Sequence, residues 1–371
     1  MKYITEFRNF EAAQALSREI HTVLAQSKPS GTQPAREIKI MEVCGGHTAA
    51  IHKYGIAGLL PSQLRLLSGP GCPVCVTSNS FLDYAVALAR EPDVIIATFG
   101  DLIRVPGSRS SLLKERAEGR DIRICYSSLD ALQIAKDNPS KRVVFLGVGF
   151  ETTAPTIAAS VKRAREEKVT NYLVLSAFKT MPNAMKALLE SGELGLDAFI
   201  CPGHVSVITG SSIYDFIARD YRTPCVISGF EPLDLLQSIL MICRQITEGR
   251  AQVENQYQRA AQAKGNALAQ DLLKEIFVLS DSDWRGIGTI PASGLALSPE
   301  YSAFDAAKQI PLKIEASREN PGCICGAIMR GVKTPAECKL FGKVCTPESP
   351  KGSCMVSDEG TCATFFKYAR P

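Results

Sequence analysis

Apolar residues recur along the chain with two periods, one typical of helices and one typical of strands. Over residues 5–26 the spacing is helical, which predicts an amphipathic opening helix. After a stretch rich in Pro, Gly and Ser at 28–35, short β-rich runs begin, and most are followed by a loop and a helical pattern. Eight of these runs are predicted to be strands: 38–43, 64–67, 94–98, 122–126, 143–148, 172–176, 198–201 and 225–228.

This alternation predicts an α/β fold of parallel sheets with helices on both faces. The polar, Pro-containing segment 137–141 favours two similar α/β domains of four strands each over one large sheet. Residues 232–279 are expected to be mainly helical and residues 280–320 irregular. The predicted divisions are an N-terminal helical segment (1–36), a first α/β domain (37–138), a second α/β domain (139–250), and a helical connector with a small cysteine-rich C-terminal domain (251–371).

The cysteine content adds chemistry to this picture. The 371 residues include 13 cysteines, and six of them lie within 323–362, a segment that we call the tail. Such a density indicates either a disulfide scaffold or a metal site. The N-terminus does not resemble a signal peptide, and no apolar run approaches the roughly 18 residues of a membrane span. We therefore expect a cytoplasmic protein with reduced thiols, which favours metal binding or redox chemistry.

The net charge and the motifs that are missing exclude several functions. A net charge of +4 without a long basic run gives no reason to expect a nucleic acid or a membrane as a partner. The sequence has no G-x-x-x-x-G-K-[ST] phosphate loop, no G-x-G-x-x-G that opens a helix after the first strand, and no H-E-x-x-H. Nucleotide-driven chemistry and zinc proteolysis lose support accordingly.

Reactive residues follow the first two predicted strands, at the sheet edge where open parallel sheets bind ligands. GPGCPVC places Cys72 and Cys75 near a helix N-terminus, so the pair can cycle between dithiol and disulfide or ligate a metal. CGGHT places Cys44 and His47 on a glycine-rich turn, which suits a transition metal or a nucleophile–base pair. A structural zinc half-site, buried thiols or an incidental Cys–His pair are the alternatives.

Two later strand-end loops, GFETTAP and CPGH, offer polar groups for contacts or proton transfer in the cleft expected between the two α/β domains. Glu151 lies in the first loop, and Cys201 and His204 lie in the second. The alternative for the first loop is that Thr153 caps the following helix while Glu151 is solvated. The cysteines within strand or helix patterns are expected to be buried in the core: Cys125, Cys225 and Cys243.

The tail cysteines have the spacing C-x-C-x12-C-x6-C-x8-C-x7-C, without the paired C-x2-4-C knuckles of a zinc ribbon. Four irregularly spaced thiolates suit a 4Fe–4S cluster and leave two cysteines as a redox-active dithiol beside it. The C-terminal domain is therefore predicted to be an iron–sulfur domain, with a structural zinc site as the alternative.

With these motifs in place, the sequence resembles the HypD family of NiFe-hydrogenase maturation factors. The resemblance rests on CGGHT, GPGCPVC, GFETTAP, CPGH and the whole tail, and it spans residues 44–362. It implies a scaffold on which the Fe(CN)2CO unit of the hydrogenase active site is assembled. It also implies a HypC-type chaperone and a HypE-type cyanide donor as partners and, indirectly, the hydrogenase large subunit.

The resemblance also implies roles for individual residues. Cys44 is similar to the iron-binding cysteine of the scaffold, with His47 beside it, and Cys72 and Cys75 are similar to a pair that ligates iron or cycles with the bound group. The tail resembles a 4Fe–4S domain arranged as in ferredoxin–thioredoxin reductase. We favour Cys323, Cys338, Cys345 and Cys362 as cluster ligands and Cys325 with Cys354 as the dithiol. The cysteine order of the reductase would instead make Cys354 a ligand and Cys362 a dithiol partner.

These roles suggest a route for electrons from the cluster to the Cys325/Cys354 pair and then to the Cys72/Cys75 pair. The route requires the tail to fold back onto the strand-end loops. The alternative function is a stand-alone 4Fe–4S-dependent disulfide reductase, which would need the tail and Cys72/Cys75 but would have no use for Cys44.

Overall fold

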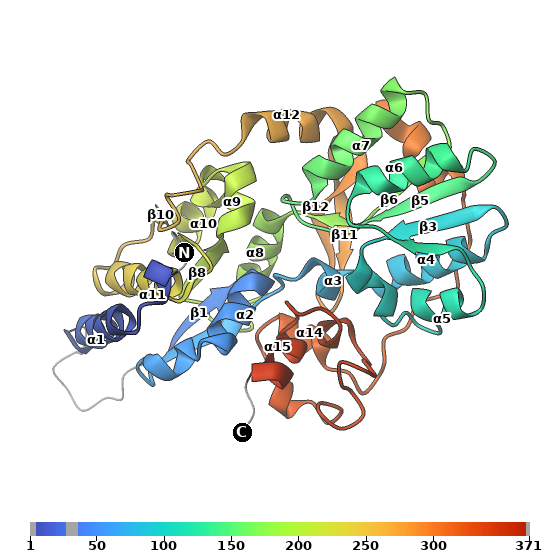
Figure 1. Cartoon of the computed structure of the whole chain (residues 1–371). Coiled ribbons are helices and arrows are strands. Elements are labelled where there is room, and N and C mark those ends of the chain that lie inside the picture. Colours follow the sequence, from blue (N-terminus) through green and yellow to red (C-terminus); the bar gives the residue numbers. More distant parts are fainter. Residues whose placement is uncertain (1–4, 27–35, 369–371) are drawn as a thin grey trace.

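Two parallel sheets form the framework of the protein, seen here in a computed structural model that describes residues 5–26 and 36–368 (Figure 1). All eight strands expected from the sequence are present, which confirms the α/β class. The stretch 28–35, rich in Pro, Gly and Ser, lies outside the described residues. The five-stranded sheet has the order β10-β9-β8-β1-β2, where β1 is Ile38–Glu42, β2 Leu64–Ser68, β8 Ala198–Pro202, β9 Cys225–Ser228 and β10 Val253–Asn255. The four-stranded sheet has the order β4-β3-β5-β6, where β3 is Val94–Thr98, β4 Ile122–Ile124, β5 Arg142–Gly147 and β6 Tyr172–Ser176.

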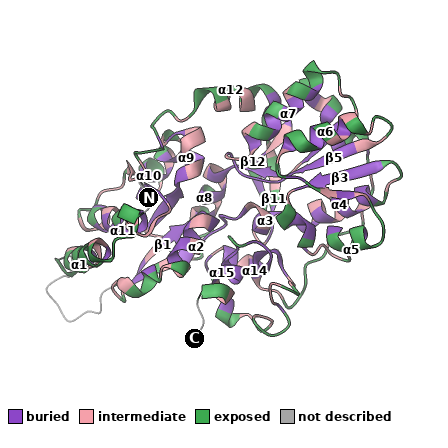
Figure 2. Cartoon of the chain, in the orientation of Figure 1, coloured by how far each residue is buried: buried purple, intermediate pink, exposed green. Residues whose placement is uncertain are grey.

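Helices cover both faces of each sheet, so the strands are largely buried (Figure 2). The five-stranded sheet packs between α1 (Phe10–Gln26), α2 (Gly45–Lys53) and α11 (Pro232–Thr247) on one face and α8 (Met181–Glu190), α9 (Gly203–Thr209) and α10 (Asp215–Asp220) on the other. The four-stranded sheet packs between α4 (Asn79–Arg90) with α5 (Leu112–Ala117) and α6 (Ser128–Asp137) with α7 (Ala154–Glu166). The short 3-10 helices outside the tail are η1 (Thr5–Arg8), η2 (Ile56–Leu59), η3 (Gly100–Arg104), η4 (Ser212–Tyr214) and η5 (Pro299–Phe304). Among the described helices, none combines the length and apolar character needed to cross a membrane.

The expected division into two sheets of four consecutive strands is wrong. β1 pairs with β8, and β3 pairs with β5, so each sheet takes strands from both sides of the boundary expected at residue 138. The polar segment 137–141 is a tight connection from α6 to β5, closed by a hydrogen bond from the Lys141 N–H to the Asn138 carbonyl oxygen (3.0 Å). A helix-to-strand turn and a domain linker have the same polar composition, and composition alone does not separate them.

A β-hairpin occupies part of the region expected to be irregular. β11 (Phe277–Trp284) and β12 (Gly288–Leu297) pair antiparallel, and β12 also pairs with the short β7 (Phe178–Lys179). The hairpin turn reaches α3 (Pro73–Val76), where the Arg285 N–H donates to the Val76 carbonyl oxygen (2.9 Å). The segment 232–279 contains α11 and α12 (Ala267–Ile276) as expected, but also β10 and the start of β11.

The tail consists of short elements and is drawn in orange and red at the bottom of Figure 1. It lies against elements that belong to both the five-stranded and the four-stranded sheet. A short helix, α13 (Ala306–Gln309), precedes the extended segment that leads to it. Its elements are α14 (Cys325–Met329), η6 (Pro335–Glu337), η7 (Ser353–Met355) and the start of α15 (Thr361–Tyr368). α15 packs beside α2, and η7 packs beside α3, so the tail contacts the elements that follow β1 and β2.

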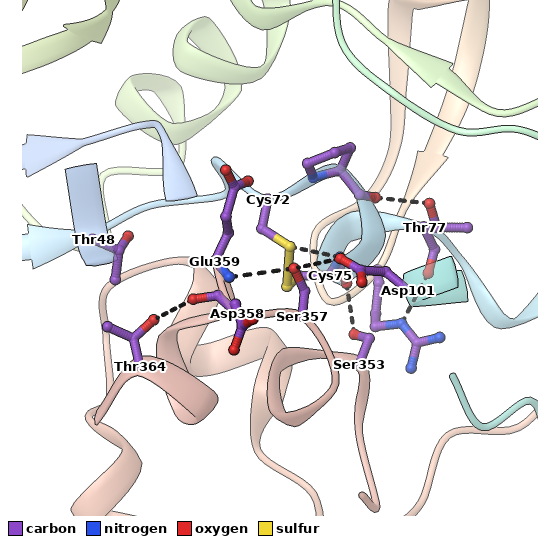
Figure 3. The surroundings of a disulfide bond; sticks show 12 residues. Thr48, Cys72, Cys75, Thr77, Asp101, Ser353, Ser357, Asp358, Glu359 and Thr364 are labelled. Carbon is purple, nitrogen blue, oxygen red and sulfur yellow. Dashed lines mark hydrogen bonds between the residues drawn. A yellow bond between two sulfur atoms is a disulfide. The ribbon is translucent and has the colours of Figure 1, made fainter. Parts of the chain in front are cut away.

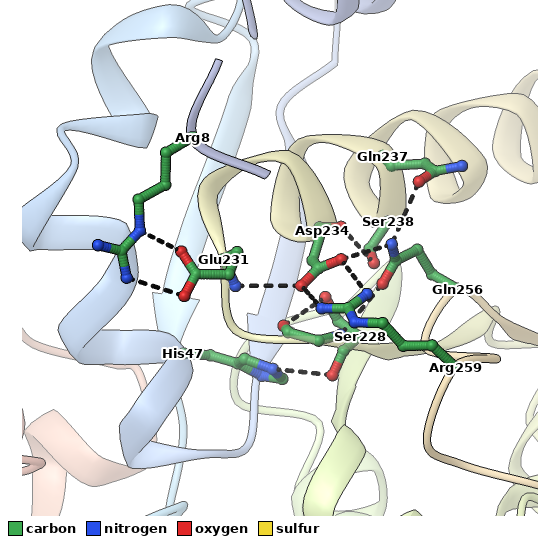
Figure 4. Close-up of polar contacts among 10 residues, drawn as sticks. Arg8, His47, Ser228, Glu231, Asp234, Gln237, Ser238, Gln256 and Arg259 are labelled. Carbon is green, nitrogen blue, oxygen red and sulfur yellow. Dashed lines mark hydrogen bonds and ion pairs between the residues drawn. The ribbon is translucent and has the colours of Figure 1, made fainter. Parts of the chain in front are cut away.

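A buried carboxylate fixes the loop between β9 and α11 (Figure 4). Asp234 is fully buried and accepts two hydrogen bonds from the Arg259 guanidinium (2.7 and 2.5 Å) and one from the Gln256 amide (2.8 Å). It also accepts the Glu231 N–H (3.1 Å), which closes a capping box at the start of α11. Because a buried charge must be paired, these hydrogen bonds stabilise the loop in this conformation.

We predict that Asp234→Ala lowers the free energy of unfolding by about 2–3 kcal/mol, because it leaves the partly buried Arg259 guanidinium without its carboxylate. Asp271→Ala is the matched control: Asp271 is 74 % exposed and lies 3.9 Å from Lys274, so its loss changes stability by less than about 0.5 kcal/mol. Urea denaturation of both variants measures the difference. Equal stabilities of the two variants would contradict the prediction.

Candidate functional site

The structure brings the two cysteine-bearing loops of β1 and β2 into direct contact. Cys44 is the N-cap residue of α2, and Cys72 is the N-cap residue of α3. The Gly45 N–H donates to the Gly71 carbonyl oxygen (3.0 Å), which joins one loop to the other. A Cβ on Gly71 would lie 2.1 Å from the Cys44 nitrogen, so the loops approach this closely only because residue 71 is glycine.

Cys72 and Cys75 form a disulfide (Figure 3). Both are buried, and the Cys75 N–H also points at the Cys72 sulfur (3.2 Å) in the first turn of α3. The oxidised pair cannot supply thiolate ligands, since both sulfurs are bonded to each other. Two electrons and two protons would convert the pair to thiols.

Cys44 is a free thiol beside His204. Its side chain is 2 % exposed, and its Sγ lies 3.8 Å from Nε2 of His204. Burial is the main cause that raises the pKa of the Cys44 thiol far above its ordinary value, and the nearby Glu359 adds to the rise. The thiol form is therefore favoured unless a metal cation binds the sulfur and a base accepts the proton.

Phe230 links the two histidines of the site. Its ring stacks on His47 (centroids 4.8 Å apart) and on His204 (4.9 Å). Nε2 of His47 lies 3.2 Å from the Ser228 carbonyl oxygen (Figure 4), whereas its Nδ1 has no hydrogen-bond partner among the described residues. Burial, with a smaller effect of His204, lowers the pKa of His47 to about 3, and burial also lowers the pKa of His204, so both rings are neutral near pH 7.

Glu42, at the end of β1, is a site residue that the sequence interpretation missed. It is 1 % exposed, accepts the Cys44 N–H (2.9 Å) and accepts the hydroxyl of Thr48. Burial raises its pKa to about 8 in spite of these hydrogen bonds. A single acidic residue in the otherwise apolar end of the run IKIMEVC was the available signal, because acidic residues are rarely buried without a partner.

Glu151 occupies a different position from the one expected. It is buried, so the alternative that it is solvated is wrong; its Oε1 accepts the Met181 N–H (2.8 Å) at the start of α8. Oε2 has no partner among the described residues, and burial raises the pKa of Glu151 to about 7. Thr153 is at the start of α7 without a capping hydrogen bond from its side chain. Cys201 is buried inside β8 next to Cys225 and packs in the same core cluster as Cys72 and Cys75.

The tail thiols are all free and lie close together. Cys325 is within hydrogen-bond reach of Cys323, Cys354 and Cys362. One small cavity with apolar walls is lined by five of the six tail cysteines: Cys323, Cys325, Cys338, Cys345 and Cys362. Across residues 5–26 and 36–368, no group of three or more His, Cys, Asp or Glu side chains is arranged to hold a metal ion.

The tail also folds back onto the loops that carry Cys44 and Cys75. The Ser353 hydroxyl donates to the Cys75 carbonyl oxygen (2.8 Å), as Figure 3 shows. A Cβ on Gly45 would lie 2.5 Å from the Cβ of Glu359, so the tail covers the start of α2 at the distance that only glycine allows. The tail therefore lies against the strand-end loops, as the expected electron route requires, and the route itself stays a prediction.

The expected buried cysteines outside the site are in the core: Cys125, Cys225 and Cys243. Of the residues expected at the site, the structure gathers Cys44, His47, His204 and the Cys72–Cys75 disulfide around the ends of β1, β2 and β8. Among the described contacts, none joins Glu151 to these groups.

Comparisons with known proteins agree with the motifs. The family model described as "HypD: Hydrogenase formation hypA family" matches residues 11–369. The chain is 48 % identical to the hydrogenase maturation factor HypD of Rhizobium leguminosarum bv. viciae, over 100 % of this chain and 96 % of that protein. It is 48 % identical to the HypD of Azotobacter vinelandii (100 % and 97 %) and 42 % identical to that of Escherichia coli strain K12 (99 % and 98 %). The chain therefore belongs to the HypD family of hydrogenase maturation factors.

Proposed function

We propose that this protein is a cytoplasmic scaffold on which the Fe(CN)2CO unit of NiFe hydrogenase is assembled, with Cys44 as the residue that holds the iron. The observation that carries the proposal is the packing of three sulfur-bearing parts against one another: the Cys44 loop, the Cys72–Cys75 disulfide and the tail. A soft thiolate ligand and a site shielded from water suit iron that carries cyanide and carbon monoxide. A HypC-type chaperone, a HypE-type cyanide donor and the hydrogenase large subunit are the partners that this function needs.

Cys44 and His204 supply the first chemical step. When iron binds the Cys44 sulfur, the thiol loses its proton, and neutral His204 has a ring nitrogen 3.8 Å away that can accept it. Glu42 holds the Cys44 backbone through its N–H, and the Phe230 ring holds His204 through stacking. His47, stacked on the same ring and bonded to the Ser228 carbonyl, fixes the other side of Phe230.

The disulfide is the second chemical group of the proposed site. A tail dithiol, Cys325 with Cys354 or with Cys362, attacks the Cys72–Cys75 bond by thiol–disulfide exchange. The tail pair becomes the disulfide, and Cys72 and Cys75 become two thiols next to Cys44. After deprotonation they can ligate the iron or reduce a bound group.

The tail cavity suits a 4Fe–4S cluster by the chemistry of its donors. Four thiolates are needed, and five thiols line the cavity between the apolar side chains of Ile328, Leu340 and Phe341. The proposed ligands are Cys323, Cys338, Cys345 and Cys362, with Cys354 in place of Cys362 as the alternative. Such a cluster would supply electrons one at a time, and two electrons together with two protons would regenerate a tail dithiol from its disulfide.

The first prediction concerns Cys44. Anaerobically purified protein in complex with its HypC-type chaperone is expected to show infrared bands of cyanide and carbon monoxide, and Cys44→Ala is expected to lose them, because the iron has lost its ligand. Cys243→Ala, at a buried cysteine of α11, is the matched control and keeps the bands. The iron and acid-labile sulfide of the tail stay in both variants.

Two outcomes would count against the scaffold. Bands that persist in Cys44→Ala would remove Cys44 as the iron ligand. Absence of the bands from every wild-type preparation, together with disulfide reduction that is unimpaired in Cys44→Ala, would favour the stand-alone reductase instead.

The second prediction concerns the disulfide. Anaerobically purified wild-type protein, denatured with a chelator, is expected to react with a thiol reagent at 11 cysteines before reduction and at all 13 after it. Cys72→Ala is expected to show no increase upon reduction, because Cys75 has lost its partner. Cys125→Ala keeps the increase of two thiols and serves as the control. An increase in Cys72→Ala would mean that another pair is oxidised.

A further inference from the structure

A large cavity lies apart from the Cys44 site, between the loop that leads into α5 and the segments that flank the tail cysteines. Its volume is about 650 Å³, within the range of roughly 300–1,000 Å³ that small-molecule sites have. The walls come from residues 104–114, 318–321 and 348–351, with Asn79 and Arg285 behind them. None of the groups assigned to the iron site or to the tail thiols lines it.

Positive charge dominates the cavity. Only two acidic residues line it, Glu319 and Glu348. The six basic residues that line it are Arg104, Arg109, Lys114, Arg285, Arg318 and Lys351. Only Arg109 forms an ion pair within 4 Å among the described residues, with Glu315, although the charge of Arg104 also acts on Glu348. The other five cations have no ion pair within the part of the chain that the structure describes, although most buried or clustered cations of proteins are paired. Five cations around one cavity attract an anion.

Arg285 is the strongest single indication of an anionic ligand. Its side chain belongs to a residue that is only 5 % exposed, and its guanidinium donates to two neutral acceptors, the Thr77 carbonyl oxygen (2.9 Å) and the side-chain oxygen of Asn79. A guanidinium that is buried against neutral acceptors carries a desolvation cost that these two hydrogen bonds only partly offset. An anion in the cavity that Arg285 lines would compensate that charge.

We propose that this cavity binds a small organic phosphate. Planar guanidinium groups match phosphate oxygens in pairs, and arginines line the cavity from three separate segments of the chain. Leu113, Pro106, Pro321 and Pro350 add apolar surface for the organic part of the ligand. The binding relies on side-chain cations, so it needs no glycine-rich phosphate loop, which the sequence does not contain.

The position of the cavity connects it to the tail. The wall segments 318–321 and 348–351 directly precede Cys323 and Gly352, and a Cβ on Gly352 would lie 2.6 Å from the Cys323 sulfur. A phosphate bound in the cavity would therefore connect the loop before α5 to the two segments that lead to Cys323 and to Gly352. This inference goes beyond the scaffold function and does not depend on it.

Pyrophosphate is the probe that tests the site, titrated by calorimetry into the full chain under anaerobic conditions. We expect one binding site, and we expect Arg318→Gln and Lys114→Gln each to weaken binding at least about tenfold, the effect of removing one charge-assisted hydrogen bond. Arg116→Gln is the matched control, because Arg116 is exposed on the same helix as Lys114 but does not line the cavity. Arg285→Gln is expected to abolish binding. Because Arg285→Gln also removes buried hydrogen bonds to Thr77 and Asn79, the Arg318→Gln and Lys114→Gln variants decide the result.

Hydrogen exchange provides an independent measurement. Pyrophosphate is expected to slow exchange of the backbone amides in 318–321 and 348–351 in wild-type protein and not in Arg318→Gln. Absence of binding, or weakening by Arg116→Gln as large as that by Lys114→Gln, would overturn the proposal. Citrate that binds as tightly as pyrophosphate would overturn the assignment to phosphate, and binding of polyglutamate in place of pyrophosphate would make the cavity a protein-docking site instead.

Discussion

No side chain larger than the hydrogen of glycine fits between the Cys44 backbone and the loop that carries the disulfide, and the candidate site depends on this close approach. A Cβ on Gly71 would overlap the Cys44 backbone at 2.1 Å, and backbone atoms cannot move aside as the end of a flexible side chain can. Gly45 has the same role toward Glu359 of the tail, and Gly352 has it toward Cys323. Glycine at the first two contacts brings the Cys44 loop, the disulfide and the tail within reach of one another, whereas the third contact lies within the tail.

Segments from the whole length of the chain are needed to maintain this arrangement. The Asp234–Arg259 ion pair fixes the loop that carries Phe230, and the hairpin of β11 and β12 supports α3 through the Arg285 backbone. The tail adds the Ser353 contact to Cys75. Two of these contacts, Arg285 with Val76 and Ser353 with Cys75, join residues more than 200 positions apart, so the site forms only when the sheets, the hairpin and the tail have all folded.

Local sequence patterns predicted the strands and the reactive loops well, and they failed where long-range pairing decides the structure. All eight expected strands and the contact between the Cys44 and Cys72 loops could be inferred, since neighbouring parallel strands end at the same sheet edge. Which strands belong to which sheet could not be inferred, because nothing in the sequence of β1 or of β8 indicates that these two strands pair. The hairpin was missed because small polar residues occupy much of β11. Many positions of this strand are exposed, so apolar and polar residues do not alternate regularly along it. Glu42 and Phe230 were missed because their importance comes only from what they touch.

Buried ionisable groups without opposite charges surround Cys44, and their protonation keeps the site close to neutral. Burial raises the pKa of Glu42 to about 8 and lowers that of His47 to about 3, so near pH 7 the carboxyl is mostly protonated and the imidazole is uncharged. The Cys44 thiol keeps its proton for the same reason. A cation placed on the Cys44 sulfur reverses this balance, because its positive charge favours the thiolate and the carboxylate. In the proposed scaffold, the Cys44 thiol and the Glu42 carboxyl are therefore the groups that can supply compensating negative charge to the iron by losing their protons.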